Sequence, residues 1–159
     1  MEYIIAIGTN IDREKNIKFA LKRLKEEFKI LAVSSLYETS PYGYRNQPNF
    51  YNMLVKISTT LQPEEVLEKL QAIEQEAGRE RRIKWGPRSL DLDIVLWSGG
   101  KIKTERLTIP HYDIKNRLFF ILPLLEIEGD IELDGENLFY LANRLLPYQG
   151  IKKIDFPRV

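Results

Sequence analysis

The stretch Glu74–Trp97, EQEAGRERRIKWGPRSLDLDIVLW, decides the fold of this chain and carries its most unusual chemistry. It passes from the end of a predicted helix through a basic loop into an apolar run that is typical of a β-strand. Successive side chains of a strand alternate between the two faces of a sheet. We therefore expect one face to carry Leu90, Leu92, Ile94 and Leu96, and the other to carry Asp91, Asp93, Val95 and Trp97.

The two aspartates need partners, because their Cα atoms lie about 6.5 Å apart on an otherwise apolar strand and a buried charge is costly. They could pair with arginines of the preceding loop, lie at a solvated sheet edge, or share divalent cations. That loop holds five basic residues, Arg79, Arg81, Arg82, Lys84 and Arg88. Guanidinium groups bind phosphate oxygens in pairs, and oxygen ligands beside phosphates favour Mg²⁺. The pattern thus favours a magnesium-dependent phosphate site, and the two other arrangements stay open.

Length and composition predict one globular domain over residues 1–159. Lys and Arg (24) nearly balance Asp and Glu (23), so net charge gives no reason to expect nucleic acid or a membrane as partner. The chain has no cysteine and one histidine, which excludes disulfides, thiolate metal sites and a histidine-rich metal site. No apolar run approaches about 18–20 residues, and the first residues, MEYIIAIG, lack a basic signal region. We therefore expect a cytoplasmic protein.

Hydrophobic periodicity predicts the order strand, helix, strand, strand, helix, strand. The expected elements are a strand over residues 3–8, a helix after an N-cap at Asp12, strands over 30–37 and 50–59, a helix that begins at Pro63 and ends before Gly78, and the strand 90–97. This order is the βαββαβ pattern of an α+β, ferredoxin-like core. The strand 50–59 should place Tyr51, Met53, Val55 and Ile57 on one face and Phe50, Asn52 and Leu54 on the other.

The C-terminal third adds helical and strand segments to this core. Residues 115–125 favour a helix that Pro123 interrupts, and residues 137–146 a last helix that ends at Pro147. Residues 39–48, TSPYGYRNQP, are a loop of a length that is often functional.

Several segments of the sequence resemble those of a known protein family. GRERRIKWGPRSLDLDI at 78–94 is similar to the signature of the 6-hydroxymethyl-7,8-dihydropterin pyrophosphokinases, enzymes of folate synthesis. Further similar segments, in family order, are GTN at 8–10, SSLYETSPYG at 34–43, NQPNFYN at 46–52, TERLTIPHYDIKNRLFF at 104–120 and PLLEI at 123–127. The resemblance covers the chain from its start to about residue 127.

The resemblance implies a role for each motif. Asp91 and Asp93 would hold two Mg²⁺ ions that bridge the phosphates of ATP, and arginines of a mobile loop would contact the triphosphate. The implied catalytic residues are Arg79, Arg81, Arg88, Asp91 and Asp93. The implied ATP-binding residues are Gln71, Glu74, Arg79, Arg81, Arg88, Ile94, Arg106, Thr108, His111, Tyr112 and Arg117.

A pterin pocket is implied in the same way. A planar heterocycle is bound by aromatic stacking and a few amide-type hydrogen bonds. The matching residues are Thr39, Ser40, Tyr42, Phe50, Asn52, Trp85 and Phe119, with Phe119 stacking opposite Phe50.

The expected reaction is ATP-dependent pyrophosphoryl transfer, in which the hydroxymethyl oxygen of the pterin attacks the β-phosphorus and AMP leaves. The expected partners are the two small substrates, without nucleic acid or membrane; oligomeric state stays open, with a monomer expected. Two other functions would use some of the same residues. Another magnesium-dependent nucleotidyl or phosphoryl transferase would also use paired aspartates. An RNA-binding module would use the basic loop and aromatic residues, and would not need Asp91 or Asp93.

Overall fold

The computed structural model describes residues 1–40, 46–78 and 90–155. Its strands are β1 (Glu2–Thr9), β2 (Lys29–Val33), β3 (Leu36–Thr39), β4 (Phe50–Ser58), β5 (Asp91–Trp97), β6 (Ile102–Lys103), β7 (Thr108–Ile109), β8 (Glu132–Leu133), β9 (Glu136–Asn137) and β10 (Ile151–Ile154). Its helices are α1 (Arg13–Glu27), α2 (Pro63–Glu76), α3 (Leu118–Glu128) and α4 (Leu138–Leu145).

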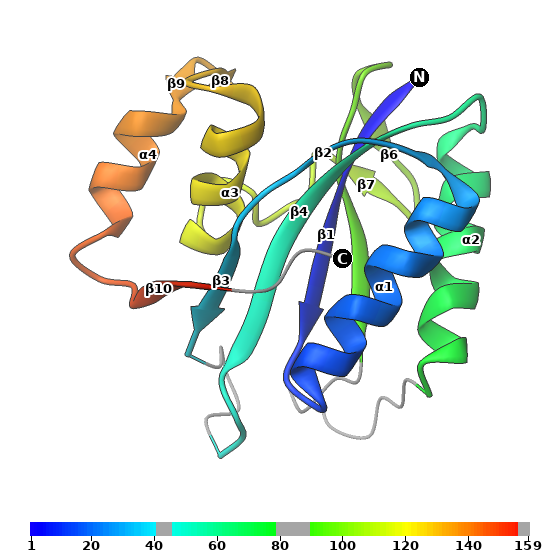
Figure 1. Cartoon of the computed structure of the whole chain (residues 1–159). Helices are drawn as coiled ribbons and strands as arrows, with labels where there is room; N and C mark the ends of the chain where they lie inside the picture. Colours follow the sequence, from blue (N-terminus) through cyan, green and yellow to red (C-terminus); the bar gives the residue numbers. More distant parts are fainter. Residues whose placement is uncertain (41–45, 79–89, 156–159) are drawn as a thin grey trace.

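An antiparallel sheet runs through the middle of the molecule (Figure 1). Its strand order is β10-β3-β4-β1-β5, and β2 also pairs with β4. Strand β1 lies between β4 and β5 and is antiparallel to both. The mixed α and β class is therefore as the sequence predicted. Among the described residues, no helix has both the length and the apolar character needed to cross a membrane.

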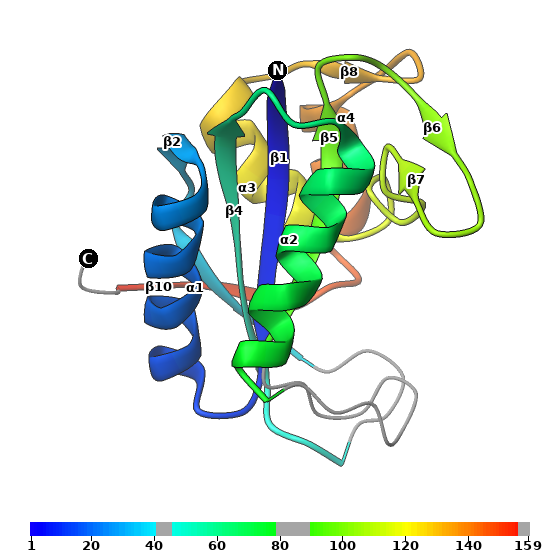
Figure 2. The ribbon, with the colours of Figure 1, turned by 90° about the vertical axis from the view of Figure 1, so that its right-hand side faces the viewer.

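Helices α1 and α2 cover one face of the sheet, as the view in Figure 2 shows. Alternate residues of the central strands supply the sheet side of this core, among them Ile5, Val55 and Leu92. The helices supply Ile17, Leu24, Leu70 and Ile73, each fully buried. The predicted faces of β4 are confirmed, because Met53, Val55 and Ile57 belong to this core while Leu54 belongs to the opposite one.

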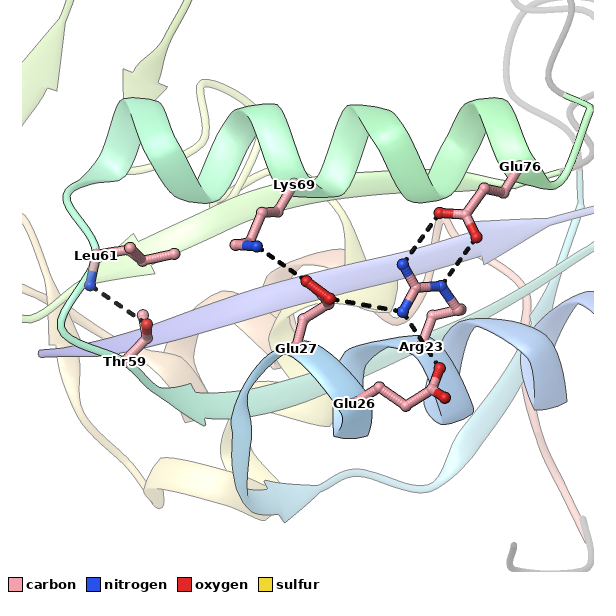
Figure 3. A network of polar contacts seen from close by, with 7 residues as sticks. All are labelled: Arg23, Glu26, Glu27, Thr59, Leu61, Lys69 and Glu76. Carbon is pink, nitrogen blue, oxygen red and sulfur yellow. Dashed lines mark hydrogen bonds and ion pairs between the residues drawn. The ribbon is translucent and has the colours of Figure 1, made fainter.

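The two covering helices are also joined by charged side chains at the surface (Figure 3). Arg23 of α1 donates to both carboxylate oxygens of Glu76 on α2, each at 3.0 Å. Lys69 Nζ of α2 donates to Glu27 Oε1 of α1 at 2.9 Å. These pairs are solvated, so they add less to stability than the apolar contacts beneath them.

Helices α3 and α4 cover the other face of the sheet (Figure 1). The second core contains Ile4 of β1, Leu54 of β4, Phe120 and Ile121 of α3, and Leu138 and Leu141 of α4. The C-terminal segment then adds β10 to the edge of the sheet beside β3. The sequence predicted the last helix but not β10. The strand IKKI has no clean alternation, and only its partner β3 gives it a place in the sheet.

The predicted strand 30–37 is two strands with a break at Ser34 and Ser35. At Ser34 a side chain takes the place of a backbone acceptor in the strand pairing. The N–H of Leu54 donates to Ser34 Oγ at 2.9 Å. The N–H of Ser35 points instead to Glu126 of α3, with 2.8 Å between Ser35 N and Oε1. Side-chain hydrogen bonds of this kind compete with regular strand pairing, which explains the break.

The face assignment in β5 was wrong at its end. Ile4 and Ile5 of β1 lie opposite Leu96 and Ile94, so Val95 is an extra residue, as in a β-bulge. Beyond it the alternation reverses: Leu96 packs in the α3–α4 core, and Trp97 packs in the α1–α2 core beside Tyr3. A bulge depends on the partner strand, so the alternation of β5 alone could not predict it.

The prediction that Pro123 interrupts a helix was also wrong, since α3 continues through it to Glu128. A proline removes one N–H, here the one that would bond to the carbonyl of Phe119. Pro123, Ile121 and Leu124 are all buried in the α3–α4 core. Their packing compensates for one lost hydrogen bond.

Candidate active site

Strand direction brings the candidate residues to one end of the sheet. Because β1 is antiparallel to β4 and β5, and β3 is antiparallel to β4, the ends of β1 and β3 lie beside the starts of β4 and β5. Gly8, Thr39, Asn52 and Asp91 occupy these positions. Asn52 shares its face with Leu54, so the group lies on the side covered by α3 and α4.

Gly8 lies in the middle of this group and has no side chain. It lies opposite Asn52 on one side and Asp91 on the other. A Cβ atom built on Gly8 would lie 3.1 Å from Asn52 Oδ1. The glycine therefore leaves open space between an amide and a carboxylate. Gly8 was not among the predicted site residues, although a glycine at the end of an apolar strand often marks the close approach of a ligand.

The Asn52 amide is held in one orientation by a predicted neighbour. Its Nδ2 donates to Thr39 Oγ1 at 2.8 Å. Because this bond uses the amino group, the carbonyl oxygen Oδ1 faces the open space over Gly8. Thr39 is buried, and Phe50 lies opposite it in the β3–β4 ladder. The structure thus brings together three residues that were predicted for the pterin pocket.

Asp93 meets His111 at the other side of the group. His111 Nε2 lies 3.9 Å from Asp93 Oδ2, with the aspartate side chain 44% exposed and the histidine 15%. The backbone of His111 is fixed by β5, because its N–H donates to the carbonyl of Val95, the bulge residue, at 3.0 Å. The bulge therefore positions the histidine beside the second aspartate.

His111 is a neutral donor in this arrangement. The N–H of Asp113 donates to His111 Nδ1 at 3.1 Å, so Nδ1 keeps its lone pair and the ring proton is on Nε2. Burial lowers the pKa of His111, and the charges of Asp113 and Asp91 oppose that shift without cancelling it. The Nε2–H is consequently available for an anionic oxygen near Asp93.

Aromatic rings surround the histidine. Its ring centroid lies 4.6 Å from that of Tyr112 and 4.8 Å from that of Phe120. Phe119, the predicted stacking residue, is partly buried, and its ring centroid lies 4.8 Å from that of Phe120. Tyr112 is 70% exposed, which leaves its ring accessible to a ligand.

Glu74 of α2 binds the free edge of β5. Its carboxylate oxygen Oε2 accepts the N–H of Leu92, the residue between the two aspartates, at 2.8 Å. The side chain is buried at 5% exposure. Glu74 therefore fixes the backbone that carries Asp91 and Asp93, at the free edge of the sheet.

Other predicted nucleotide residues are dispersed. Ile94 is buried in the α1–α2 core, and Gln71 is exposed on α2. Arg106 pairs with Glu64 at 3.2 Å, and Arg117 with Asp113 at 3.0 Å. Thr108 and Ser40 are exposed. The remaining predicted site residues, Tyr42, Arg79, Arg81, Trp85 and Arg88, lie outside the described residues, as do Arg82 and Lys84.

The donor set suits a hard cation that keeps part of its water shell. Mg²⁺ in phosphate-transfer sites binds one or two carboxylates and completes its coordination with water and phosphate oxygens. Asp91 and Asp93 supply two carboxylates from one strand face, and Asp93 is partly open to solvent. Among residues 1–40, 46–78 and 90–155, no three histidine or acidic side chains form a closed metal cage.

Comparison with known proteins identifies the family that this arrangement fits. The model of the 7,8-dihydro-6-hydroxymethylpterin-pyrophosphokinase family matches residues 4–129. A 2-amino-4-hydroxy-6-hydroxymethyldihydropteridine pyrophosphokinase of Bacillus subtilis is 47% identical over 136 residues, which cover 84% of this chain and 81% of the relative. The enzyme of the same name from Aquifex aeolicus is 41% identical over 128 residues, 80% of each chain.

Solved structures show the same fold. The Plasmodium falciparum HPPK-DHPS crystal structure with pteroate superposes with a TM-score of 0.74 at 16% identity. The match covers 92% of this chain and 42% of the Plasmodium chain, so this chain spans less than half of that protein.

Proposed function

The chain belongs to the 7,8-dihydro-6-hydroxymethylpterin-pyrophosphokinase family, and from that membership we propose that it transfers pyrophosphate from ATP to hydroxymethyl-dihydropterin in folate synthesis. The observation that carries this proposal is the group at one end of the sheet. An oriented amide, a bare glycine and two carboxylates lie on adjacent strands, with a neutral histidine beside the second carboxylate.

The pterin half of the site uses β3, β4 and α3. Asn52 Oδ1 accepts an N–H of the heterocycle, with its amide held by Thr39. Gly8 allows the ring to approach the sheet closely. Phe50 and Phe119 stack on the two ring faces, and Ser40, Tyr42 and Trp85 complete the pocket as the family resemblance implies. This arrangement orients the hydroxymethyl oxygen of the substrate toward Asp91 and Asp93.

The phosphate half uses β5 and the segment that follows it. Asp91 and Asp93 would hold two Mg²⁺ ions, and such ions would supply charge neutralisation at the phosphates and orientation of the attacking oxygen. His111 donates its Nε2–H to a phosphate oxygen and has no role as a base, since its Nδ1 accepts from Asp113. Tyr112, Arg117, Arg106, Thr108, Gln71, Glu74 and Ile94 remain the proposed nucleotide environment. Arg79, Arg81 and Arg88 provide positive charge to the transferring group.

The test is incubation of the purified protein with ATP, Mg²⁺ and hydroxymethyl-dihydropterin. We expect AMP and the pterin diphosphate in equal amounts, and no turnover when EDTA is in excess over magnesium. Release of inorganic pyrophosphate instead of AMP would assign the paired aspartates to nucleotidyl transfer. RNA binding that falls steeply with salt, without turnover, would support the binding-module alternative.

The proposal also includes the fold type, the domain organisation and the location of the protein. The strand order β5-β1-β4 with β2 and β3 beside β4, together with α1 and α2 on one face, supports a ferredoxin-like core. Residues 1–159 form one domain that acts as a monomer. We also propose that it works in the cytoplasm.

A further inference from the structure

Glu126, near the end of α3, accepts one hydrogen bond from Ser35, just before β3, and one from Tyr37 within β3. Its Oε1 accepts the backbone N–H of Ser35 at 2.8 Å, and its Oε2 accepts the hydroxyl of Tyr37. Tyr37 is 5% exposed. Burial disfavours the charged form of Glu126, but the bonds from Tyr37 and Ser35 outweigh it, so the pKa of this carboxyl lies below its usual range. The pair is thus an ionised carboxylate with two donors, the strong form of such a contact.

Both ends of this contact lead to the pterin pocket. On α3, Phe119 and Glu126 are seven residues apart, so they lie on the same helix face about 10 Å apart along the axis. On the sheet, Tyr37 lies directly opposite Asn52 and two residues before Thr39. The contact therefore joins the helix that carries the stacking ring to the strands that carry the amide.

We propose that Glu126 and Tyr37 are positioning residues for the pterin substrate, which set the separation between Phe119 on α3 and the Thr39–Asn52 pair on the sheet. This inference rests on the proposed function. Neither side chain touches the ligand. A planar ring bound between an aromatic side chain and an amide tolerates little change in that spacing, because misplacement by about 1 Å can cost up to about a hundredfold.

A second contact between α3 and the sheet provides a matched control. Glu128 pairs with Lys56 of β4 at 2.6 Å, two residues beyond Glu126. It ties the same helix end to the sheet and carries the same charge. Its ion pair is with β4, whereas Glu126 binds Ser35 and Tyr37, and its partner Lys56 lies four residues from Asn52 along β4. Loss of Glu128 should therefore change stability without changing the pocket.

The experiment compares the parent enzyme with Tyr37→Phe, Glu126→Gln and Glu128→Gln. Steady-state kinetics give KM for the pterin and for ATP separately, and a fluorescence titration gives the pterin Kd with a non-hydrolysable ATP analogue present. For Tyr37→Phe and Glu126→Gln we expect the pterin KM and Kd to rise about tenfold, with the ATP KM within about twofold of the parent. For Glu128→Gln we expect both KM values to stay within about twofold.

Each outcome decides one question. A parent enzyme that releases no AMP contradicts the proposed function itself. With an active parent, unchanged pterin constants in both Tyr37→Phe and Glu126→Gln overturn the positioning role. Equal increases in the pterin and ATP constants, or an equal effect in Glu128→Gln, would also overturn it, because they indicate general loosening of α3.

Discussion

Three properties of Asp93 bear on its proposed role as a metal ligand. It lies on a strand whose other face is core, it is partly solvated, and it faces a neutral histidine donor at 3.9 Å. A partly solvated carboxylate of this kind is a ligand that Mg²⁺ prefers, so the proposed metal role of Asp93 can be tested by one substitution.

We expect Asp93→Ala to remain folded and to lose about a thousandfold in kcat, which corresponds to about 4 kcal/mol of transition-state stabilisation. Steady-state assays at saturating ATP and Mg²⁺ measure this, with circular dichroism as the folding check. Asp155→Ala, at an exposed carboxylate outside the site, is the control. An Asp93→Ala enzyme within tenfold of the parent would be inconsistent with metal binding by this residue.

Gly8 tests the pterin side of the site with one methyl group. In Gly8→Ala the new Cβ would lie 3.1 Å from Asn52 Oδ1, so the amide must move by a few tenths of an ångström. We expect the pterin KM to rise about tenfold and the ATP KM to change less. Gly150→Ala, where nothing lies within 4 Å of the new Cβ, controls for the substitution itself. If both variants bind pterin like the parent, Gly8 does not line the pocket.

At the scale of elements, we predict that the contact between α2 and β5 stabilises the fold. Removal of the Glu74 carboxylate leaves the N–H of Leu92 buried without that acceptor. An unsatisfied buried donor costs about 1–3 kcal/mol, so we expect Glu74→Ala to lower the free energy of unfolding by about 2 kcal/mol. Glu74→Gln keeps an oxygen acceptor and should lose less. Urea denaturation measures both, and the exposed Glu68→Ala on the same helix should stay near the parent. A Glu74→Ala protein as stable as Glu68→Ala would show that the contact is not a stabilising one.

The contact of α3 with β3 gives a pH prediction. The pKa of Glu126 is lower in the folded chain than its ordinary value of 4.5. A lowered folded pKa means that the ionised carboxylate stabilises the fold above pH 4.5, and that this contribution is lost as pH falls through the folded pKa. The difference in unfolding free energy between the parent and Glu126→Gln should thus be constant from pH 6 to 8 and shrink below 4.5. A difference that grows in acid would reverse the assigned sign.

The sequence predicts an element well when its hydrophobic pattern lies within the element itself. It does not predict features that depend on a contact with a residue far away in the sequence. The faces of β4 follow from alternation of Leu54 and Val55, and Asp12 marks the start of α1, although its side chain makes no cap hydrogen bond. Asn52 and Asp93 were predicted as site residues from short motifs, and their roles stay predictions. The break at Ser35 depends on Glu126, 91 residues away, and the bulge at Val95 depends on the pairing with β1. No local signal encodes such contacts.

On the scale of the whole molecule, one sheet serves two cores. Adjacent residues of β1 feed both: Ile4 packs against α3 and α4, and Ile5 against α1 and α2. The C-terminal segment beyond the family match completes the second core through Leu138 and Leu141. It also holds the start of α3, because Gln149 Oε1 accepts the N–H of Leu118 at 2.9 Å. We therefore expect the two halves to lose structure together.

This sharing predicts a single unfolding transition for the chain. Leu141 of α4 is fully buried, whereas Phe139 on the same helix is 58% exposed. We expect Leu141→Ala to lower the free energy of unfolding by about 2–5 kcal/mol, and Leu70→Ala in the other core to do the same, because each leaves a cavity. Phe139→Ala should cost much less. Calorimetry should give one peak in every variant, with equal calorimetric and van't Hoff enthalpies. Two peaks, of which Leu141→Ala moves only one, would mean that the α3–α4 layer folds separately and that the chain is not one domain.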